Sequence, residues 1–169
     1  RKKFREIFEG NPSNNNIYSG VSNGLLPQGL NNYFPLLFNN TENLFNYLTK
    51  QNRIELVIHM GANSSTIETN FRLIYNVNTR FSRKIWTWCT SNNIRLIYAS
   101  SAATYGNGSK GFTESENEKY TPLNIYGLSK YLFDKYAIKQ ARKNTCPPQW
   151  VGLKFFNVYG PNEYHKGRM

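Results

Sequence analysis

The chain is poor in cysteine, in acidic side chains and in long apolar runs. Its 169 residues include two cysteines, Cys89 and Cys146, which are too few for a disulfide framework and fit a reducing, cytoplasmic compartment. No apolar run approaches the roughly 20 residues that cross a bilayer, so we expect no membrane span. The basic N-terminal residues lead into no apolar segment of the kind that a secretory signal requires. The two cysteines and two histidines lack metal-ligand spacing, so no metal site is predicted.

Acidic residues are scarce relative to basic ones. Ten Asp and Glu stand against 21 Lys and Arg, which gives a formal net charge of +11. Such a charge attracts nucleic acid or, equally, an acidic small molecule that carries phosphate. The basic residues are scattered from Arg1 to Arg168, and the chain has no zinc-finger, basic-zipper or RNA-binding signature. The sequence therefore predicts no nucleic-acid partner.

The first 40 residues have the composition of loops. Residues 1–40 are rich in Asn, Gly and Pro, and Gly20, Gly24 and Gly29 follow no apolar strand of the kind that precedes a nucleotide-binding turn. We therefore expect residues 1–40 to be poorly ordered and residues 41–169 to form the folded domain.

Apolar periodicity improves sharply after this segment. Strands are expected at residues 54–60, 95–99 and 150–156, and helices at residues 41–50, around 77–92, and 126–142. Apolar strands that alternate with helices are typical of an α/β fold whose parallel sheet is covered on both faces. Ligands bind such sheets at the carboxyl ends of the strands, so a site is expected there.

Three polar side chains near this edge have useful chemistry. Tyr126 and Lys130 are four residues apart and so share one face of the predicted helix. A nearby ammonium favours the phenolate, which lets a tyrosine act as acid or base. Ser101 follows a strand, where a hydroxyl could bind a substrate oxygen, although serines also commonly begin turns. Each feature alone also occurs by chance.

Taken together, four segments have the order and spacing of the extended short-chain dehydrogenase/reductases. These segments are residues 61–65, 98–106, 126–130 and 155–161. Within that superfamily the chain resembles the ADP-L-glycero-D-manno-heptose 6-epimerase family, which belongs to the NAD-dependent epimerases and dehydratases. The resemblance covers roughly residues 54–169 and is carried most closely by residues 99–106, 122–127 and 156–167.

The resemblance implies a partial Rossmann-type, doubly wound parallel sheet that binds one NADP per subunit. It also implies an isomerase that inverts C6 of the ADP-linked heptose through a transient 6-keto intermediate, in the synthesis of lipopolysaccharide core precursors. The substrate is then a nucleotide sugar, and a homo-oligomer is compatible with the family. Another extended nucleotide-sugar epimerase or dehydratase, and a non-catalytic scaffold that kept the fold, remain as alternatives.

Residue roles follow from the resemblance by position. Tyr126 corresponds to one catalytic acid/base and Lys166 to a second one on the opposite face of the sugar. Ser101 corresponds to the residue that binds the reacting oxygen, and Lys130 to the one that holds the nicotinamide ribose. Implied cofactor contacts are Met60, Gly61, Ala62, Asn63, Ser64, Asn76 (with Asn78 as the other candidate of that turn), Tyr126, Lys130, Val158 and Lys166. Implied substrate contacts are Ser101, Asn157 and Arg168.

Three departures from the family pattern limit what the chain can do. No glycine-rich turn follows a strand before Ile54, although the backbone N–H groups of such a turn normally hold the pyrophosphate. The sequence stops soon after Lys166, before most of the substrate domain, and Arg168 stands where the family carries a small hydroxyl residue. We therefore expect a chain that lacks the first βα unit, binds NADP weakly or not at all, and is inactive in this form.

Overall fold

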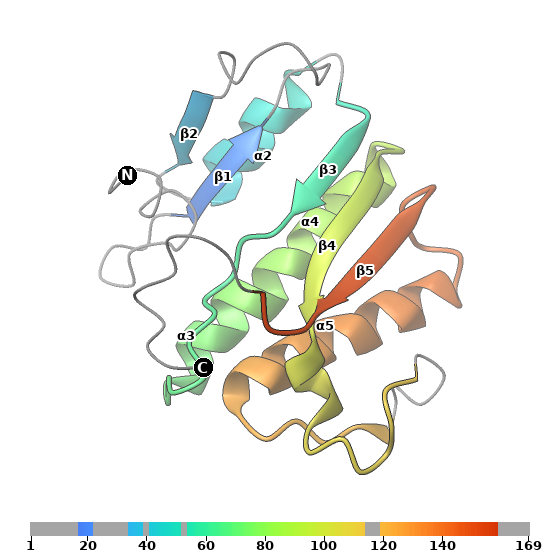
Figure 1. Cartoon of the computed structure of the whole chain (residues 1–169). Helices are drawn as coiled ribbons and strands as arrows, with labels where there is room; N and C mark the ends of the chain where they lie inside the picture. The colour runs from blue at the N-terminus through green and yellow to red at the C-terminus, as the bar shows by residue number, and fades with distance from the viewer. Residues whose placement is uncertain (1–16, 22–33, 39–40, 52–53, 114–118, 159–169) are drawn as a thin grey trace.

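The computed structural model describes residues 17–21, 34–38, 41–51, 54–113 and 119–158 (Figure 1). Its elements are β1 (Ile17–Val21), β2 (Phe34–Phe38), α2 (Thr41–Thr49), β3 (Leu56–His59), α3 (Phe71–Ile74), η2 (Tyr75–Arg80), α4 (Phe81–Ser91), β4 (Arg95–Ser101), η3 (Ala102–Tyr105), α5 (Ile125–Ala141) and β5 (Trp150–Phe155). The fold is α/β, as the sequence predicts, and each strand and helix predicted after residue 40 is present.

The central feature is a three-stranded parallel sheet in the order β3-β4-β5. Its register pairs His59 with Tyr98 at the end of β3, and Ser101 with Phe155 at the end of β5. The carboxyl ends of all the strands in this sheet therefore lie at one edge. This arrangement is the partial Rossmann-type sheet that the resemblance implied.

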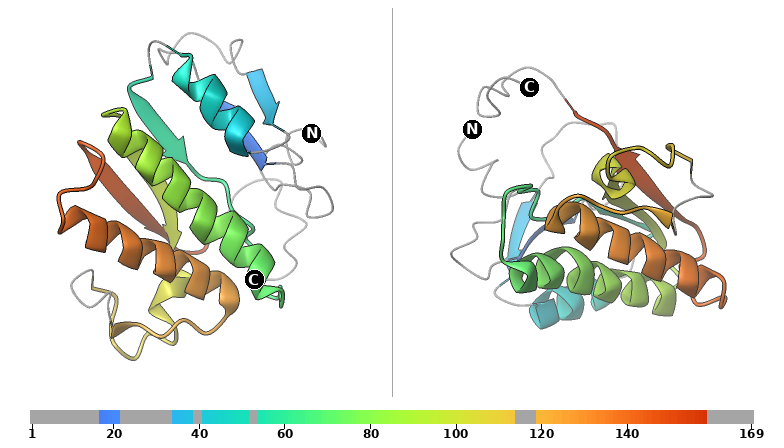
Figure 2. Two further views of the ribbon diagram at one scale, coloured as in Figure 1. Left: turned by 180° about the vertical axis from the view of Figure 1, so that it is seen from behind. Right: turned by 90° about the horizontal axis from the view of Figure 1, so that it is seen from below.

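Helices α4 and α5 cover one face of this sheet (Figures 1 and 2). The core between them centres on Trp86 of α4, whose ring lies 4.9 Å from Trp150 of β5 and 6.2 Å from Phe133 of α5, both edge-on. Edge-to-face aromatic pairs of this kind add to the free energy gained by burial. Leu96 and Tyr98 of β4 are buried against the same cluster.

The opposite face of the sheet differs from the sequence prediction, which expected helices on both sides. Among the residues that the structure describes, no helix lies over this face. Its outward side chains are apolar and exposed: Leu56, Ile58, Val151, Leu153 and Phe155, at 39–57%. The apolar side chains that predicted a covered face are therefore present, but no helix of the described residues covers them.

A continuous helical run connects β3 to β4. Asn70 caps its start by accepting a hydrogen bond from the Leu73 amide, 3.0 Å away. The middle of the run, η2, is a π-helical turn, a feature found frequently at functional sites. Phe81, Ile85 and Cys89 are buried, as their helical spacing predicts.

Helix α5 buries a face that mixes polar and apolar side chains. Asn124 caps it by accepting a hydrogen bond from the Gly127 amide at 2.7 Å. Its buried positions include Ser129, Lys130 and Asp134. The apolar side chains on its other positions, Leu128, Leu132, Tyr136 and Ile138, are only half-buried.

The segment before α2 contains a two-stranded antiparallel pair, β1 with β2. Both strands lie within residues 1–40, for which the sequence predicted poor order. The rest of that segment lies outside the described residues. The proposed division into residues 1–40 and 41–169 therefore stays a prediction. No helix in the described ranges is both long enough and apolar enough to cross a membrane.

Candidate active site

Ser101 is the last residue of β4 and starts the turn at the carboxyl edge of the sheet. Its Oγ accepts a hydrogen bond from the Ala103 amide at 3.1 Å and so caps the short helix η3. The side chain is 8% exposed. Because the cap uses a lone pair of the oxygen, the hydroxyl proton remains available as a donor to a substrate oxygen.

Gly127 brings helix α5 against this turn. A Cβ at Gly127 would lie 2.6 Å from the carbonyl oxygen of Ala103, so a side chain does not fit without a shift of the backbone. The first turn of α5, which carries half-buried Tyr126, therefore touches the turn that Ser101 caps. The structure thus brings Ser101 and Tyr126 to neighbouring turns, although they are 25 residues apart in the sequence.

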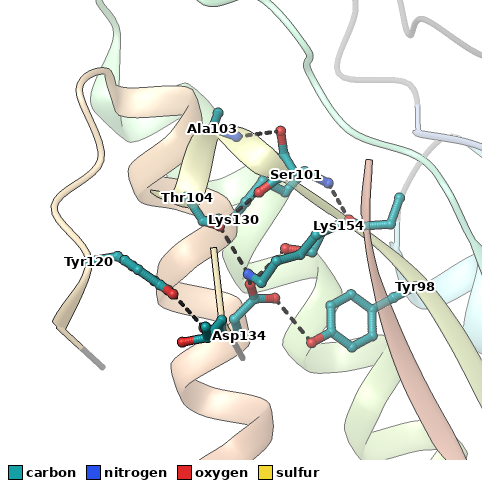
Figure 3. Close-up of polar contacts among 11 residues, drawn as sticks. Tyr98, Ser101, Ala103, Thr104, Tyr120, Lys130, Asp134 and Lys154 are labelled. Atoms are coloured by element: carbon teal, nitrogen blue, oxygen red, sulfur yellow. Dashed lines mark hydrogen bonds and ion pairs between the residues drawn. The ribbon is translucent and has the colours of Figure 1, made fainter. Parts of the chain in front are cut away.

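Lys130 lies one helical turn after Tyr126 and is buried, with 5% of its surface exposed. Its Nζ donates a hydrogen bond to the carbonyl oxygen of Ala99 at 2.9 Å (Figure 3). Burial lowers the pKa of Lys130 to about 8, and the negative charge of Asp134 opposes that shift. With this pKa the side chain is mainly an ammonium at pH 7, held beneath the end of β4.

Asn78 joins the loop after β3 to helix α5. Its Nδ2 donates to the backbone oxygen of Asn63 at 2.9 Å and to the hydroxyl of Ser129 at 3.0 Å, while its Oδ1 accepts from the Asn63 amide at 2.8 Å. Asn78 is fully buried, whereas Asn76 is exposed. Of the two asparagines between which the sequence could not decide, Asn78 is the one that fixes the loop.

His59 ends β3 and lies behind the same loop. Ser82 donates its hydroxyl proton to the backbone oxygen of Asn78, so the 2.8 Å contact between His59 Nε2 and Ser82 Oγ uses the Nε2–H as donor. Burial, together with the positive charge of nearby Lys130, lowers the pKa of His59 to about 3. His59 is therefore a neutral, internal hydrogen-bond donor at neutral pH.

The remaining predicted site residues are spread along the same edge. Met60 and Ser64 are exposed, and Gly61, Ala62 and Asn63 are half-buried in the loop after β3. Asn157 and Val158 follow β5 and are exposed. Lys166 and Arg168 lie outside the described residues. Within the described part of the chain, no cluster of His, Cys, Asp and Glu is placed to hold a metal ion.

Sequence reasoning missed Asp134 and Lys154, which form an ion pair behind Lys130. Lys154 Nζ lies 2.6 Å from Asp134 Oδ2, and both side chains are almost fully buried. The spacing of four residues between Lys130 and Asp134 was a signal that could have found the first of them, because such residues share a helix face. Lys154 shares the inward face of β5 with Gly152 and Trp150, because side chains two residues apart in a strand point to the same side, and this was the signal for the second.

Comparisons with known proteins point the same way. Residues 31–169 match the NAD dependent epimerase/dehydratase family. The ADP-L-glycero-D-manno-heptose-6-epimerase of Fusobacterium nucleatum is 54% identical over 120 residues, 69% of this chain and 35% of that protein. The enzyme of the same name from Brachyspira hyodysenteriae is 48% identical over 126 residues, 73% of this chain and 39% of that protein. The chain thus spans little more than a third of the length of these relatives.

Solved structures show the same fold. The crystal structure of Helicobacter pylori ADP-L-glycero-D-manno-heptose-6-epimerase is similar with a TM-score of 0.63 and 32% identity, over 76% of this chain and 39% of that one. The UDP-glucose 4-epimerase of Thermus thermophilus, solved with NAD, is similar with a TM-score of 0.60 and 25% identity, over 73% of this chain and 40% of that one. Since the family match covers most of the sequence and the fold agrees with it, this chain belongs to the NAD dependent epimerase/dehydratase family.

Proposed function

We propose that this chain is the central part of an ADP-glyceromanno-heptose 6-epimerase, an isomerase that inverts C6 of the nucleotide-linked sugar. The observation that carries the proposal is the contact between Gly127 and Ala103, which sets Tyr126 and Ser101 on touching turns above the buried Lys130. Homologues with this enzyme name at 54% and 48% identity support the choice of substrate.

In the proposed reaction Tyr126 accepts the proton of the C6 hydroxyl as that carbon is oxidised to a ketone, and Ser101 donates a hydrogen bond to the same oxygen. Lys130, as a buried ammonium, favours the phenolate of Tyr126. Inversion through a planar ketone requires proton transfer on the opposite face as well, and we assign that role to Lys166. Asn157 and Arg168 are proposed to contact the substrate. Lys166 and Arg168 both lie outside the described residues.

The described residues suit the nicotinamide half of a dinucleotide cofactor. The Lys130 ammonium and the Tyr126 hydroxyl can donate hydrogen bonds to it, and the loop 60–64, which Asn78 fixes through Asn63, contains the small residues Gly61 and Ala62. When bound, a nicotinamide supplies a reversible acceptor for the C6 hydride. We propose that the cofactor is NADP, with further contacts from Val158 and Asn76. A glycine-rich turn that would hold the pyrophosphate is lacking among the described residues, so we expect the chain alone to bind NADP weakly and to be inactive.

A chimera tests this function directly. The 120 residues that match the Fusobacterium nucleatum relative are placed in that protein in exchange for its own segment. We expect the chimera to epimerise ADP-heptose at C6 and to bind NADPH more tightly than NADH, as followed by nicotinamide fluorescence. The chain alone is expected to show neither activity.

The substrate panel of the same experiment separates the alternatives. Turnover of a UDP- or dTDP-sugar in preference to ADP-heptose would identify another nucleotide-sugar epimerase or dehydratase. A chimera that binds cofactor and turns over nothing would support a scaffold, and so would a Tyr126→Phe variant with unchanged properties. The cytoplasmic location and a homo-oligomeric state remain predictions from sequence and family.

A further inference from the structure

A buried polar cluster lies directly behind the proposed catalytic residues and takes no part in the reaction described above. It consists of Tyr98 and Ser100 on β4, Thr104 on η3, Asp134 on α5 and Lys154 on β5 (Figure 3). Four elements of the candidate site, β4, η3, α5 and β5, thus each contribute to one connected cluster.

Asp134 is the centre of this cluster. Its Oδ1 accepts a hydrogen bond from the Tyr98 hydroxyl at 3.0 Å, and its Oδ2 accepts from the Ser100 hydroxyl and from Lys154 Nζ, both at 2.6 Å. The chain makes room for one of these donors, because a Cβ at Gly152 would overlap the Tyr98 ring. Charge-assisted hydrogen bonds of this length are among the stronger ones in proteins.

The cluster leads from Asp134 to Ser101. Lys154 Nζ also donates to Thr104 Oγ1 at 2.9 Å, and the Thr104 hydroxyl donates to the backbone oxygen of Ser101 at 2.8 Å. The ammonium of Lys154 lies in addition 5.2 Å from the centre of the Tyr105 ring. The carboxylate on α5 is therefore connected through two side chains to the residue proposed to bind the reacting oxygen.

Asp134 also acts on Lys130, which lies one turn before it on α5. The charged and titratable groups that face Lys130 are Asp134 on its own helix and His59 on β3, and β4 contributes the carbonyl oxygen of Ala99. His59 is neutral at pH 7, so the carboxylate is the charged group among these that stabilises the buried ammonium. Lys154, on β5, forms an ion pair with the same carboxylate.

We propose that Asp134 is a positioning residue, whose buried carboxylate keeps Lys130 charged and, through Lys154 and Thr104, fixes the turn of Ser101 against helix α5. The inference rests on the proposed function in treating Ser101, Tyr126 and Lys130 as the catalytic set. A buried ion pair is in general a weak source of stability, because desolvation offsets the attraction between the charges. The directional bonds of this pair, at the junction of β4, η3, α5 and β5, assign it a positioning role instead.

The test compares two variants of the whole 169-residue chain that break the same ion pair from opposite sides. The protein is labelled with carbon-13 at lysine Cε, and the pKa of Lys130 is measured by NMR. In Asp134→Asn we expect the pKa of Lys130 to fall by about one unit, because the stabilising carboxylate is gone. In Lys154→Met we expect it to rise, since the charge of Asp134 then acts on Lys130 alone. Lys154→Arg, which keeps the charge, should leave it nearly unchanged.

An ion pair that does not act on Lys130 and only holds the fold together predicts a different result. Both variants would then leave the pKa of Lys130 unchanged, or shift it in the same direction through a common change in packing. That result would overturn the proposal. Amide exchange at Ala103, whose N–H caps onto Ser101, is expected to accelerate in both variants, and unchanged exchange would also contradict it. If Asp134→Asn does not fold, the double variant with Lys154→Met removes both members of the ion pair, so that Lys154 is not left without its partner. It carries the same test, with a lowered pKa of Lys130 expected and an unchanged one contradicting the proposal.

This experiment uses neither substrate nor cofactor, so its outcome is independent of the chimera assay. Opposite shifts of the Lys130 pKa together with an inactive chimera would leave the positioning role in place and reject the epimerase assignment. An active chimera together with parallel shifts would do the reverse.

Discussion

Acidification should destabilise the chain through His59, and the size of the effect follows from its burial. The imidazole lies at the end of β3, donates to Ser82 and has a pKa of about 3. In the unfolded chain the same group titrates near its ordinary value of about 6.5. Between these values the unfolded state binds more protons than the folded state, so the free energy of unfolding falls as the pH falls through this window.

Linkage gives the magnitude of this loss. With these two pKa values the histidine is expected to remove about 2 kcal/mol of stability at pH 5 and about 3 kcal/mol at pH 4, relative to pH 8. A loss of this size is a large part of the total stability of a small domain. The contribution is fully present above pH 6.5.

Urea denaturation of the chain between pH 4 and pH 8 measures this contribution, with His59→Gln as the reference. Glutamine keeps an N–H that can donate to Ser82 but does not titrate. His165 lies outside the described residues and is replaced by glutamine in both proteins, so that its titration does not enter the comparison. We expect the His59 protein to lose about 2 kcal/mol more than the variant between pH 8 and pH 5. Parallel pH profiles for the two proteins would refute the reasoning.

Three further predictions concern the contacts that build the site. Asn78→Ala should lower the free energy of unfolding by about 2 kcal/mol or more, because it leaves the amide and carbonyl of Asn63 without their partner. It should also speed amide exchange at Asn63. Exposed Asn76→Ala is the control, and its free energy of unfolding should stay within about 0.5 kcal/mol of the parent. Gly127→Ala places a Cβ 2.6 Å from the Ala103 carbonyl oxygen. The overpacking cost of about 1–3 kcal/mol should exceed the gain of about 1 kcal/mol in helix propensity, so the variant should be less stable. A net stabilisation in urea denaturation would contradict the close approach. The free energy of unfolding should increase between pH 8 and pH 10.5, because lysine in the unfolded chain holds its proton over that range while folded Lys130 has lost it. The increase, measured by urea denaturation, should be absent in Lys130→Met. Equal pH profiles of stability for the two proteins would count against burial of the ammonium.

Much of the fold could be predicted from the sequence because the strands and helices after residue 40 have clear apolar patterns. The run at 95–99 and the helical spacing of Phe81, Ile85 and Cys89 gave the observed elements to within a few residues. Helix α5 shows the limit of this reasoning. Its buried face mixes Phe133 and Ala137 with Ser129, Lys130 and Asp134, so apolar spacing alone does not identify that face.

The candidate site was found through strand ends and motif spacing, which need no knowledge of packing. Such reasoning places Ser101, Tyr126 and Lys130 at one edge, and the structure brings their turns together. It could not choose between Asn76 and Asn78, because both fit the pattern and only burial separates them. It also missed Lys154, since its partner Asp134 is 20 residues away in the sequence and pairs with it only once α5 has packed against β5.

The most direct test of the proposed function is the stereochemical outcome at C6 of ADP-heptose in the chimera with the Fusobacterium nucleatum relative. The chimera is compared with its Tyr126→Phe variant, which lacks only the phenolic hydroxyl, with product isomers resolved by NMR. We expect the parent chimera to approach an equilibrium mixture of the two C6 isomers, and the variant to lose 100-fold or more in rate, on the order of a positioned acid/base, while it still binds NADPH. A variant as active as its parent, or a parent that leaves C6 unchanged, would contradict the assignment of Tyr126 as the catalytic acid/base of a heptose epimerase.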